Sequence, residues 1–121
     1  ELALQIQEIL LNLLKNALDA QLAAGRADHA IVVSLDADGD ADRIVIAVRD
    51  HGAGATNEDL ARMFEAFFTT KQDGMGLGLS ICKTIVETHG GTLEAEVPAD
   101  GLGLSVRFTL PCPKDSTDAC Q

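Results

Sequence analysis

Three alternating glycines, Gly74, Gly76 and Gly78, carry the strongest chemical signal in the sequence, because they lead directly into an apolar-periodic stretch. Glycine has no Cβ, so other groups can approach its backbone closely and its φ can be positive. Where such a run opens a helix, free N–H groups and the positive helix end attract anions, phosphate above all. The spacing predicts a phosphate-binding loop. A flexible turn before a surface helix is the alternative.

Two better-known phosphate loops are excluded. The P-loop pattern Gly-x-x-x-x-Gly-Lys-Ser/Thr occurs nowhere in the chain. A dinucleotide-binding fingerprint requires a buried strand directly before its first glycine, whereas the polar residues 69–73 stand there. Lys71, three residues before Gly74, is placed to reach a phosphate. A phosphate site here therefore belongs to another fold.

A polar stripe near the N-terminus is the second chemical signal. Glu8, Asn12 and Asn16 recur at i, i+4 spacing, with Lys15 and Asp19 alongside. Asparagine costs about 0.5 kcal/mol inside a helix because its side chain competes for the backbone. Two asparagines one turn apart therefore indicate a polar task, with a merely tolerated polar stripe as the alternative.

The third signal is an acid followed by two glycines, Asp50-x-Gly52-x-Gly54, at the end of a predicted strand. The carboxylate can accept a hydrogen bond from an exocyclic amine, while the glycines let a flat ring approach the backbone. The pattern favours a site for a planar ligand. An ordinary turn remains the alternative, because Asp-x-Gly is common in turns.

Composition limits the class of protein. The 121 residues suffice for one domain with a core, and the net charge of −10 argues against binding to nucleic acid or to anionic membranes. An acidic protein that binds a polyphosphate must offset its own field locally, which a divalent cation and a few bases can do. The three cysteines show no Cys-x-x-Cys spacing and are interpreted as free thiols.

The elements that must position these motifs follow from hydrophobic periodicity. A long helix is expected up to about residue 24, ended by Gly25, and a short one over 57–63, capped by Thr56 with Asp59. A third helix follows the glycines and stops at His89-Gly90-Gly91. Strands are expected over 30–35, 44–49, 92–97 and 104–110.

Four stretches now stand in one order along the chain: residues 12–20, 50–54, 64–71 and 74–80. This set closely resembles the catalytic ATP-binding domain of sensor histidine kinases, where these stretches are the N, G1, F and G2 boxes. The match covers roughly residues 5 to 110. The short gap from Phe68 to Gly74 is most similar to the nitrogen-regulation and oxygen-sensing branch. Ala66 and Ala55 depart from the family pattern, which affects loop stiffness more than chemistry.

The resemblance implies an α+β fold, a Bergerat-type α/β sandwich with a mixed sheet and helices packed on one face. Residues 1–110 would form the catalytic domain and 111–121 a flexible C-terminal tail. Asn16 would coordinate the Mg²⁺ of ATP, assisted by Asn12, and Asp50 would accept from the adenine amino group. Asn12, Asn16 and Lys71 form the implied catalytic set. The implied ATP-binding residues are Asn16, Lys15, Asp50, Gly52, Gly54, Phe64, Phe68, Thr70, Lys71, Gly74, Met75, Gly76, Leu77, Gly78 and Leu79.

Position 12 separates two chemistries. Related ATPases of the gyrase and mismatch-repair kind carry a glutamate there, which activates water. Asn12 cannot act as a general base, so the resemblance implies transfer to an acceptor rather than hydrolysis, although Glu8 lies one turn further back.

The resemblance implies a protein-histidine kinase whose acceptor is absent from this chain. None of its three histidines stands on a predicted helix beside an acid, so we expect the acceptor on an upstream dimerisation domain. The implied partners are that domain and a response regulator receiver domain, in a homodimeric parent protein. This domain would lie in the cytoplasm without nucleic acid or direct membrane contact, and whether the parent is anchored in a membrane stays open. Two alternatives remain open: a nucleotide-gated binding module and an anti-sigma-type serine kinase of the same fold.

Overall fold

The computed structural model describes residues 2–38, 42–65 and 78–111. In chain order the elements are α1 (Leu2–Ala23), β1 (Val32–Asp38), β2 (Arg43–Arg49), α2 (Asn57–Arg62), α3 (Gly78–Thr88), β3 (Thr92–Glu96) and β4 (Ser105–Pro111). Every predicted helix and strand is present. The end of β1 differs most from the prediction, because Ala37 and Asp38 continue the ladder opposite Ile44 and Arg43.

The strands form one sheet in the order β1-β2-β4-β3. The resemblance implied a mixed sheet, whereas each neighbouring pair of the described strands runs antiparallel. Two hairpins, β1–β2 and β3–β4, are joined where β2 pairs with β4, and Ile46 lies opposite Phe108 at that seam. Pro111 was expected to begin the tail but ends β4 opposite Arg43. Residues 112–121 lie outside the described ranges.

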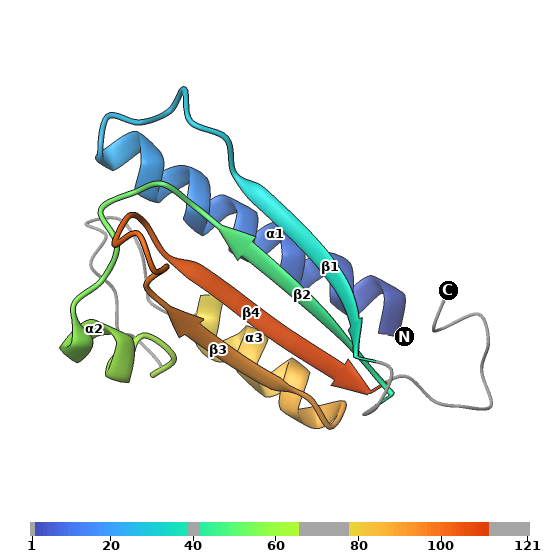
Figure 1. The fold of residues 1–121 in the computed structure, drawn as a ribbon. Coiled ribbons are helices and arrows are strands. Elements are labelled where there is room, and N and C mark those ends of the chain that lie inside the picture. Colours follow the sequence, from blue (N-terminus) through green and yellow to red (C-terminus); the bar gives the residue numbers. More distant parts are fainter. Residues whose placement is uncertain (1, 39–41, 66–77, 112–121) are drawn as a thin grey trace.

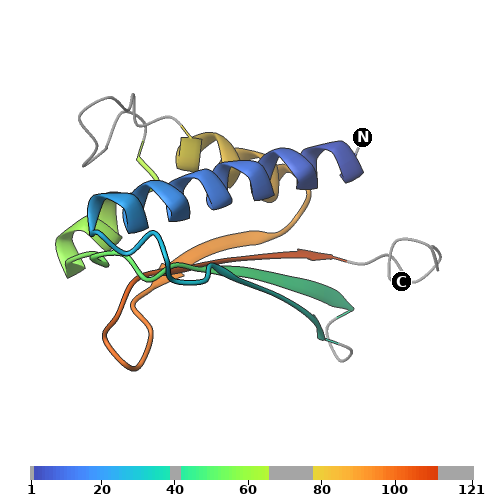
Figure 2. The same cartoon turned by 90° about the horizontal axis from the view of Figure 1, so that it is seen from above.

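Two helices cover one face of this sheet. Figure 2 shows α1 and α3 side by side above the strands, and α2 lies at one end of the molecule in Figure 1. Alternate strand residues point into the layer between helices and sheet, which is the pattern of a half-buried sheet. The buried core consists of Ile9, Leu13, Ala17, Ile46, Val48, Cys82, Val86, Leu93, Val106, Phe108 and Leu110.

The residues that cap or end the helices are those that the sequence predicted. Thr56 Oγ1 accepts a hydrogen bond from the Asp59 N–H at 3.0 Å, which satisfies one free donor in the first turn of α2. Gly25 follows α1 with φ +71° and Gly90 follows α3 with φ +81°. Both glycines adopt the left-handed conformation in which helices commonly end.

Candidate functional site

One face of α1 carries a row of residues at i, i+4 spacing, namely Asn12, Asn16 and Ala20, and Glu8 continues it toward the N-terminus. Such spacing places side chains one above another on a helix. All three members of the row are half-buried, whereas Glu8 is exposed. The row is therefore partly covered by other parts of the molecule and partly open to solvent.

At one end of the row, Asn12 meets the first residue of α3. A Cβ added at Gly78 would lie 2.8 Å from Asn12 Oδ1, so the missing side chain lets the start of α3 approach the amide. Glu8, Leu11, Asn12 and Lys15 line an open hollow beside this contact. The structure thus brings the paired-amide helix to the end of the glycine-rich segment.

The Cys82 thiol lies beneath this contact, only 1% exposed. Burial raises its pKa to about 11, an effect to which the negative charge of Glu8 adds and which a hydrogen bond with the Asn12 side chain opposes. The thiol is therefore protonated at neutral pH and acts as a packing group under Asn12. Of the cysteines, Cys112 and Cys120 lie outside the described residues.

At the other end of the row, Ala20 meets Gly52. A Cβ added at Gly52 would lie 2.7 Å from Ala20 Cβ and 2.9 Å from the Ala20 carbonyl oxygen. Any larger residue would push this segment away from α1. Asn12 and Ala20 are eight residues apart, which corresponds to about 12 Å along a helix axis.

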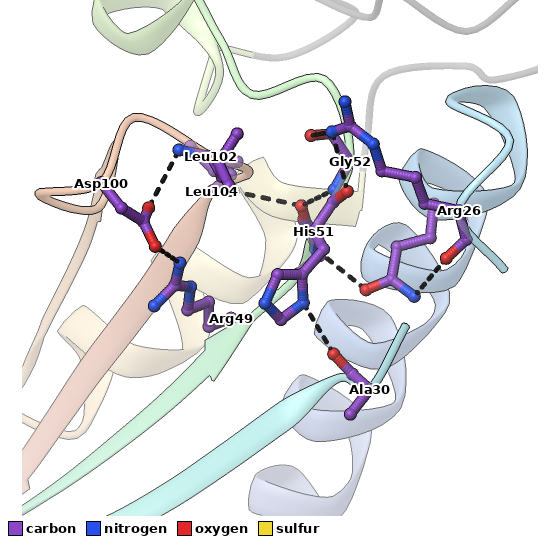
Figure 3. Close-up of polar contacts among 10 residues, drawn as sticks. Arg26, Ala30, Arg49, His51, Gly52, Asp100, Leu102 and Leu104 are labelled. Atoms are coloured by element: carbon purple, nitrogen blue, oxygen red, sulfur yellow. Dashed lines mark hydrogen bonds and ion pairs between the residues drawn. The ribbon is translucent and has the colours of Figure 1, made fainter. Parts of the chain in front are cut away.

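Asp50 follows β2 directly and is 6% exposed. Its N–H donates to the Leu104 carbonyl at 2.9 Å, which ties the end of β2 to the start of β4. Its Oδ1 accepts from the Gly52 N–H at 2.9 Å and from the Leu104 N–H at 3.2 Å (Figure 3). Both hydrogen bonds end on Oδ1, so they restrict the orientation of the carboxylate. Neither of them uses Oδ2.

Burial raises the pKa of Asp50 above its ordinary value of 3.8. The hydrogen bonds from Gly52 and Leu104 oppose that shift, as do the charges of His51 and Arg49. The carboxylate is thus held in a partly desolvated place at a cost in stability. Such a cost is typical of a group positioned for a ligand rather than for folding.

Gly103 presses the β3–β4 connection against the same carboxylate-bearing residue. It has φ +75°, and a Cβ there would lie 2.0 Å from the Asp50 carbonyl oxygen. Gly54 has φ +80°, and a Cβ there would lie 2.9 Å from the Gly103 carbonyl oxygen. Sequence reasoning placed Gly54 against a ligand ring. In the described part of the chain its near neighbour is another backbone.

Two further residues of this site escaped sequence reasoning. Gln21, 1% exposed, and Arg26 both bond to the backbone of residues 51 and 52, as Figure 3 shows for Arg26. A signal for Gln21 was available, because it extends the buried row Ile9, Leu13, Ala17 by one more i, i+4 step. A polar residue in an apolar row needs hydrogen-bond partners.

Three other predicted residues are described but lie in different settings. Phe64 packs at the edge of the hydrophobic core, and Lys83 Nζ lies 5.3 Å from its ring centroid. Leu79 also packs against the core, one residue into α3. Lys15 is exposed beside the asparagine row. The predicted residues Phe68, Thr70, Lys71, Gly74, Met75, Gly76 and Leu77 lie outside the described residues.

The metal chemistry open to the site is limited. Within residues 2–38, 42–65 and 78–111, no group of three or more His, Cys, Asp or Glu side chains could hold a metal ion. Mg²⁺ commonly takes one or two protein oxygens together with substrate phosphates and water. The amide oxygens of Asn12 and Asn16 fit that pattern.

No helix in the described ranges combines the length and apolarity needed to cross a bilayer.

Comparison with known proteins agrees with this geometry. Residues 1–114 match the family described as histidine kinase-, DNA gyrase B- and HSP90-like ATPases. Sensor protein FixL of Bradyrhizobium diazoefficiens is 42% identical over 112 residues, covering 93% of this chain and 21% of FixL. Sensor histidine kinase ZraS of Klebsiella oxytoca is 43% identical over 107 residues, covering 88% of this chain and 22% of ZraS. The chain therefore spans about a fifth of these relatives.

Solved structures give the same result. The mycobacterial sensor histidine kinase MprB superposes with a TM-score of 0.76 at 29% identity, covering 88% of this chain and 70% of that one. Full-length ShkA in complex with AMPPNP gives 0.73 at 31% identity, covering 88% of this chain and 21% of that one. The chain belongs to the histidine kinase-, DNA gyrase B- and HSP90-like ATPase family, and within it is the ATP-binding catalytic domain of a histidine kinase.

Proposed function

We propose that this domain binds ATP with Mg²⁺ and transfers the γ-phosphoryl group to a histidine on another segment of a longer sensor protein. Phosphoryl transfer depends mostly on positioning and on neutralising charge, so a site of asparagine, glycine and lysine is chemically sufficient. The observation that carries the proposal is the row on α1, because its two ends meet the start of α3 and the segment after Asp50.

The length of the row supports a nucleoside triphosphate as the ligand. About 12 Å of helix separates Asn12 from Ala20, and a nucleoside triphosphate in an extended form spans a comparable distance from base to terminal phosphate. Asp50 Oδ2 would accept from the adenine amino group, because both backbone bonds use Oδ1. Residues 74–79 would hold the phosphates through their N–H groups, with Lys71 and Lys15 adding positive charge. Gly52, Gly54, Phe64, Phe68 and Thr70 would complete the nucleotide site.

Asn16 would hold the magnesium ion, assisted by Asn12. When bound, the ion would neutralise the phosphate charge that an acidic protein otherwise repels. The two amides would offer oxygens in one line, because they stand one helical turn apart on a rigid element. Packing against Gly78 and Cys82 restricts Asn12 to one place.

Asn12 also favours transfer over hydrolysis. An amide cannot take a proton from water, so it cannot activate water as a glutamate at this position would. Asn12 and Lys71, with Asn16, therefore serve to position the phosphates for an incoming nucleophile. The acceptor histidine would come from an upstream dimerisation domain. A response regulator receiver domain would then take the phosphoryl group, with this domain of the homodimeric parent acting in the cytoplasm.

Mixing this chain with a separately purified acceptor bundle and γ-labelled ATP tests the proposal. We expect acid-labile, base-stable phosphohistidine on the bundle, dependent on Mg²⁺. Phosphoserine on another partner would instead favour the anti-sigma-type kinase. Nucleotide binding without any transfer would favour a nucleotide-gated binding module. The matched control is Arg107→Met on the open face of the sheet, which should transfer at the normal rate.

A further inference from the structure

Gln21 sits at the centre of a hydrogen-bond network at the C-terminal end of α1. Its Nε2 donates to the His29 carbonyl at 2.8 Å and to the Arg26 carbonyl at 3.2 Å. Its Oε1 accepts from the His51 N–H at 2.9 Å. One buried amide thus links three segments: the end of α1, the loop that follows it and the residue after Asp50. All of its polar atoms are used, which a side chain 1% exposed requires.

Arg26 also forms hydrogen bonds with the backbone of His51 and Gly52. Its Nη1 donates to the His51 carbonyl at 3.2 Å and to the Gly52 carbonyl at 3.1 Å. The His51 ring adds a third tie, because its Nδ1 lies 2.8 Å from the Ala30 carbonyl, which can only accept, so this nitrogen carries the proton. The backbone N–H and C=O groups of His51 and Gly52 are therefore all paired, the Gly52 N–H with Asp50 Oδ1.

We infer that Gln21 and Arg26 are positioning residues for recognition of the nucleotide base. Both lie beyond the Ala20 end of the row on α1, away from Asn12. They fix the His51–Gly52 backbone, the Gly52 N–H fixes Asp50 Oδ1, and the orientation of Oδ2 toward an exocyclic amine follows. This inference rests on the proposed function, because it assigns these residues to the base end of the same site. The phosphate end, where Asn12 meets Gly78, lies two helical turns away.

Because the two ends are separate, substitutions at Gln21 or Arg26 should change the affinity for ATP but not the affinity for a ligand that binds only the phosphate end. ATP engages both ends of the site, whereas inorganic tripolyphosphate with Mg²⁺ engages the phosphate end alone. In Gln21→Met, which keeps the buried volume but loses the amide, ATP should bind about tenfold more weakly, the effect of roughly one net hydrogen bond. Tripolyphosphate should bind as in the wild type. Arg26→Met should show the same split, and Arg26→Lys should recover most of the ATP affinity, because an ammonium can donate to the same carbonyls.

The test is calorimetric titration of the purified chain with each ligand in Mg²⁺, with thermal unfolding measured in parallel. The matched controls are Gln7→Met, at an exposed position of α1, and Arg107→Met, whose side chain pairs with Glu94 on the open face. Both should bind ATP normally. If Gln21→Met does not fold, the partly exposed Arg26 pair of variants decides alone.

Two results would overturn the inference: unchanged ATP affinity in folded Arg26→Met, or equal weakening of ATP and tripolyphosphate, which indicates a general structural role. Failure of the proposed function gives a different result, because the wild-type chain itself would then show no heat with ATP.

Discussion

Gly103 and Gly101 form a matched pair for testing how the backbone around Asp50, the proposed base end of the site, is held in place. Both lie in the β3–β4 connection with nearly the same φ, +75° and +76°. A Cβ at Gly103 would lie 2.0 Å from the Asp50 carbonyl oxygen and 3.0 Å from His51 Cα, whereas at Gly101 nothing lies within 4 Å. Substitution by alanine therefore strains both backbones alike but forces an overlap at Gly103 alone.

The free-energy cost of alanine at a positive φ can be separated from the cost of the steric overlap. Alanine in the left-handed region costs about 1 kcal/mol, which is the whole effect expected for Gly101→Ala. Gly103→Ala adds an overlap with backbone that cannot rotate away, for which about 2 kcal/mol more is typical. At about 4 °C per kcal/mol for a domain of this size, the melting temperature should fall by about 4 °C and about 12 °C respectively.

Thermal unfolding followed by circular dichroism gives both values, and titration with ATP in Mg²⁺ gives the functional consequence. Because the overlap displaces Asp50, Gly103→Ala should also weaken ATP binding, while Gly101→Ala should not. Equal melting temperatures for the two variants would refute the reasoning. So would a destabilised Gly103→Ala that binds ATP as tightly as the wild type, since Asp50 would then not depend on this contact.

Two further predictions concern the contact between α1 and α3. Asn12→Glu places a general base beside the start of α3, so basal ATP hydrolysis should rise by about 100-fold, the lower end of the contribution of a positioned base. A phosphate-release assay that finds no rise would contradict the role given to position 12, and Gln7→Glu on the same helix is the control. Cys82 should resist iodoacetamide at pH 8 in the folded chain and react after unfolding, because burial raises its pKa to about 11. Mass-spectrometric mapping that finds Cys82 modified as rapidly as a free thiol would disprove its burial.

The local structure was readable from the sequence because its causes are local. The apolar period gave α1, and Gly25 and Gly90 marked helix ends through a conformation that glycine adopts easily. The Thr56 cap was predictable from its spacing to Asp59 alone. The motif pattern also predicted Asp50 and Asn12 as site residues, because their types suit the chemistry implied by the resemblance, and that assignment stays a prediction.

The rest depends on contacts between distant segments. Gly52 is fixed by Ala20 and Gly103 by Asp50, and neither spacing indicates that these backbones touch. The antiparallel pairing of β2 with β4 likewise joins strands that lie far apart in the chain, with α2, α3 and β3 described between them. Gln21 was also missed, although its place in an apolar row of α1 could have indicated a buried polar group; its partners could not be read from that pattern.

Comparison of the wild type with Asp50→Asn by calorimetric titration with ATP and Mg²⁺ tests the central claim most directly. Asparagine keeps an oxygen for the Gly52 and Leu104 N–H groups but turns an NH₂ group toward the adenine amine. We predict a clear heat of binding for the wild type and at least about 100-fold weaker binding for the variant, the loss of a charge-assisted hydrogen bond plus a donor clash.

The Asp50→Asn substitution should not lower the thermal stability of the chain, a result that would exclude misfolding as the cause of weaker ATP binding. Because the pKa of Asp50 is raised in the folded chain, the stability it contributes is present below its unfolded value of 3.8 and is lost as pH rises through the folded value. At pH 7 the variant should therefore unfold at a temperature no lower than the wild type. Equal ATP affinity in a folded Asp50→Asn, or no heat of binding in the wild type, would contradict the account.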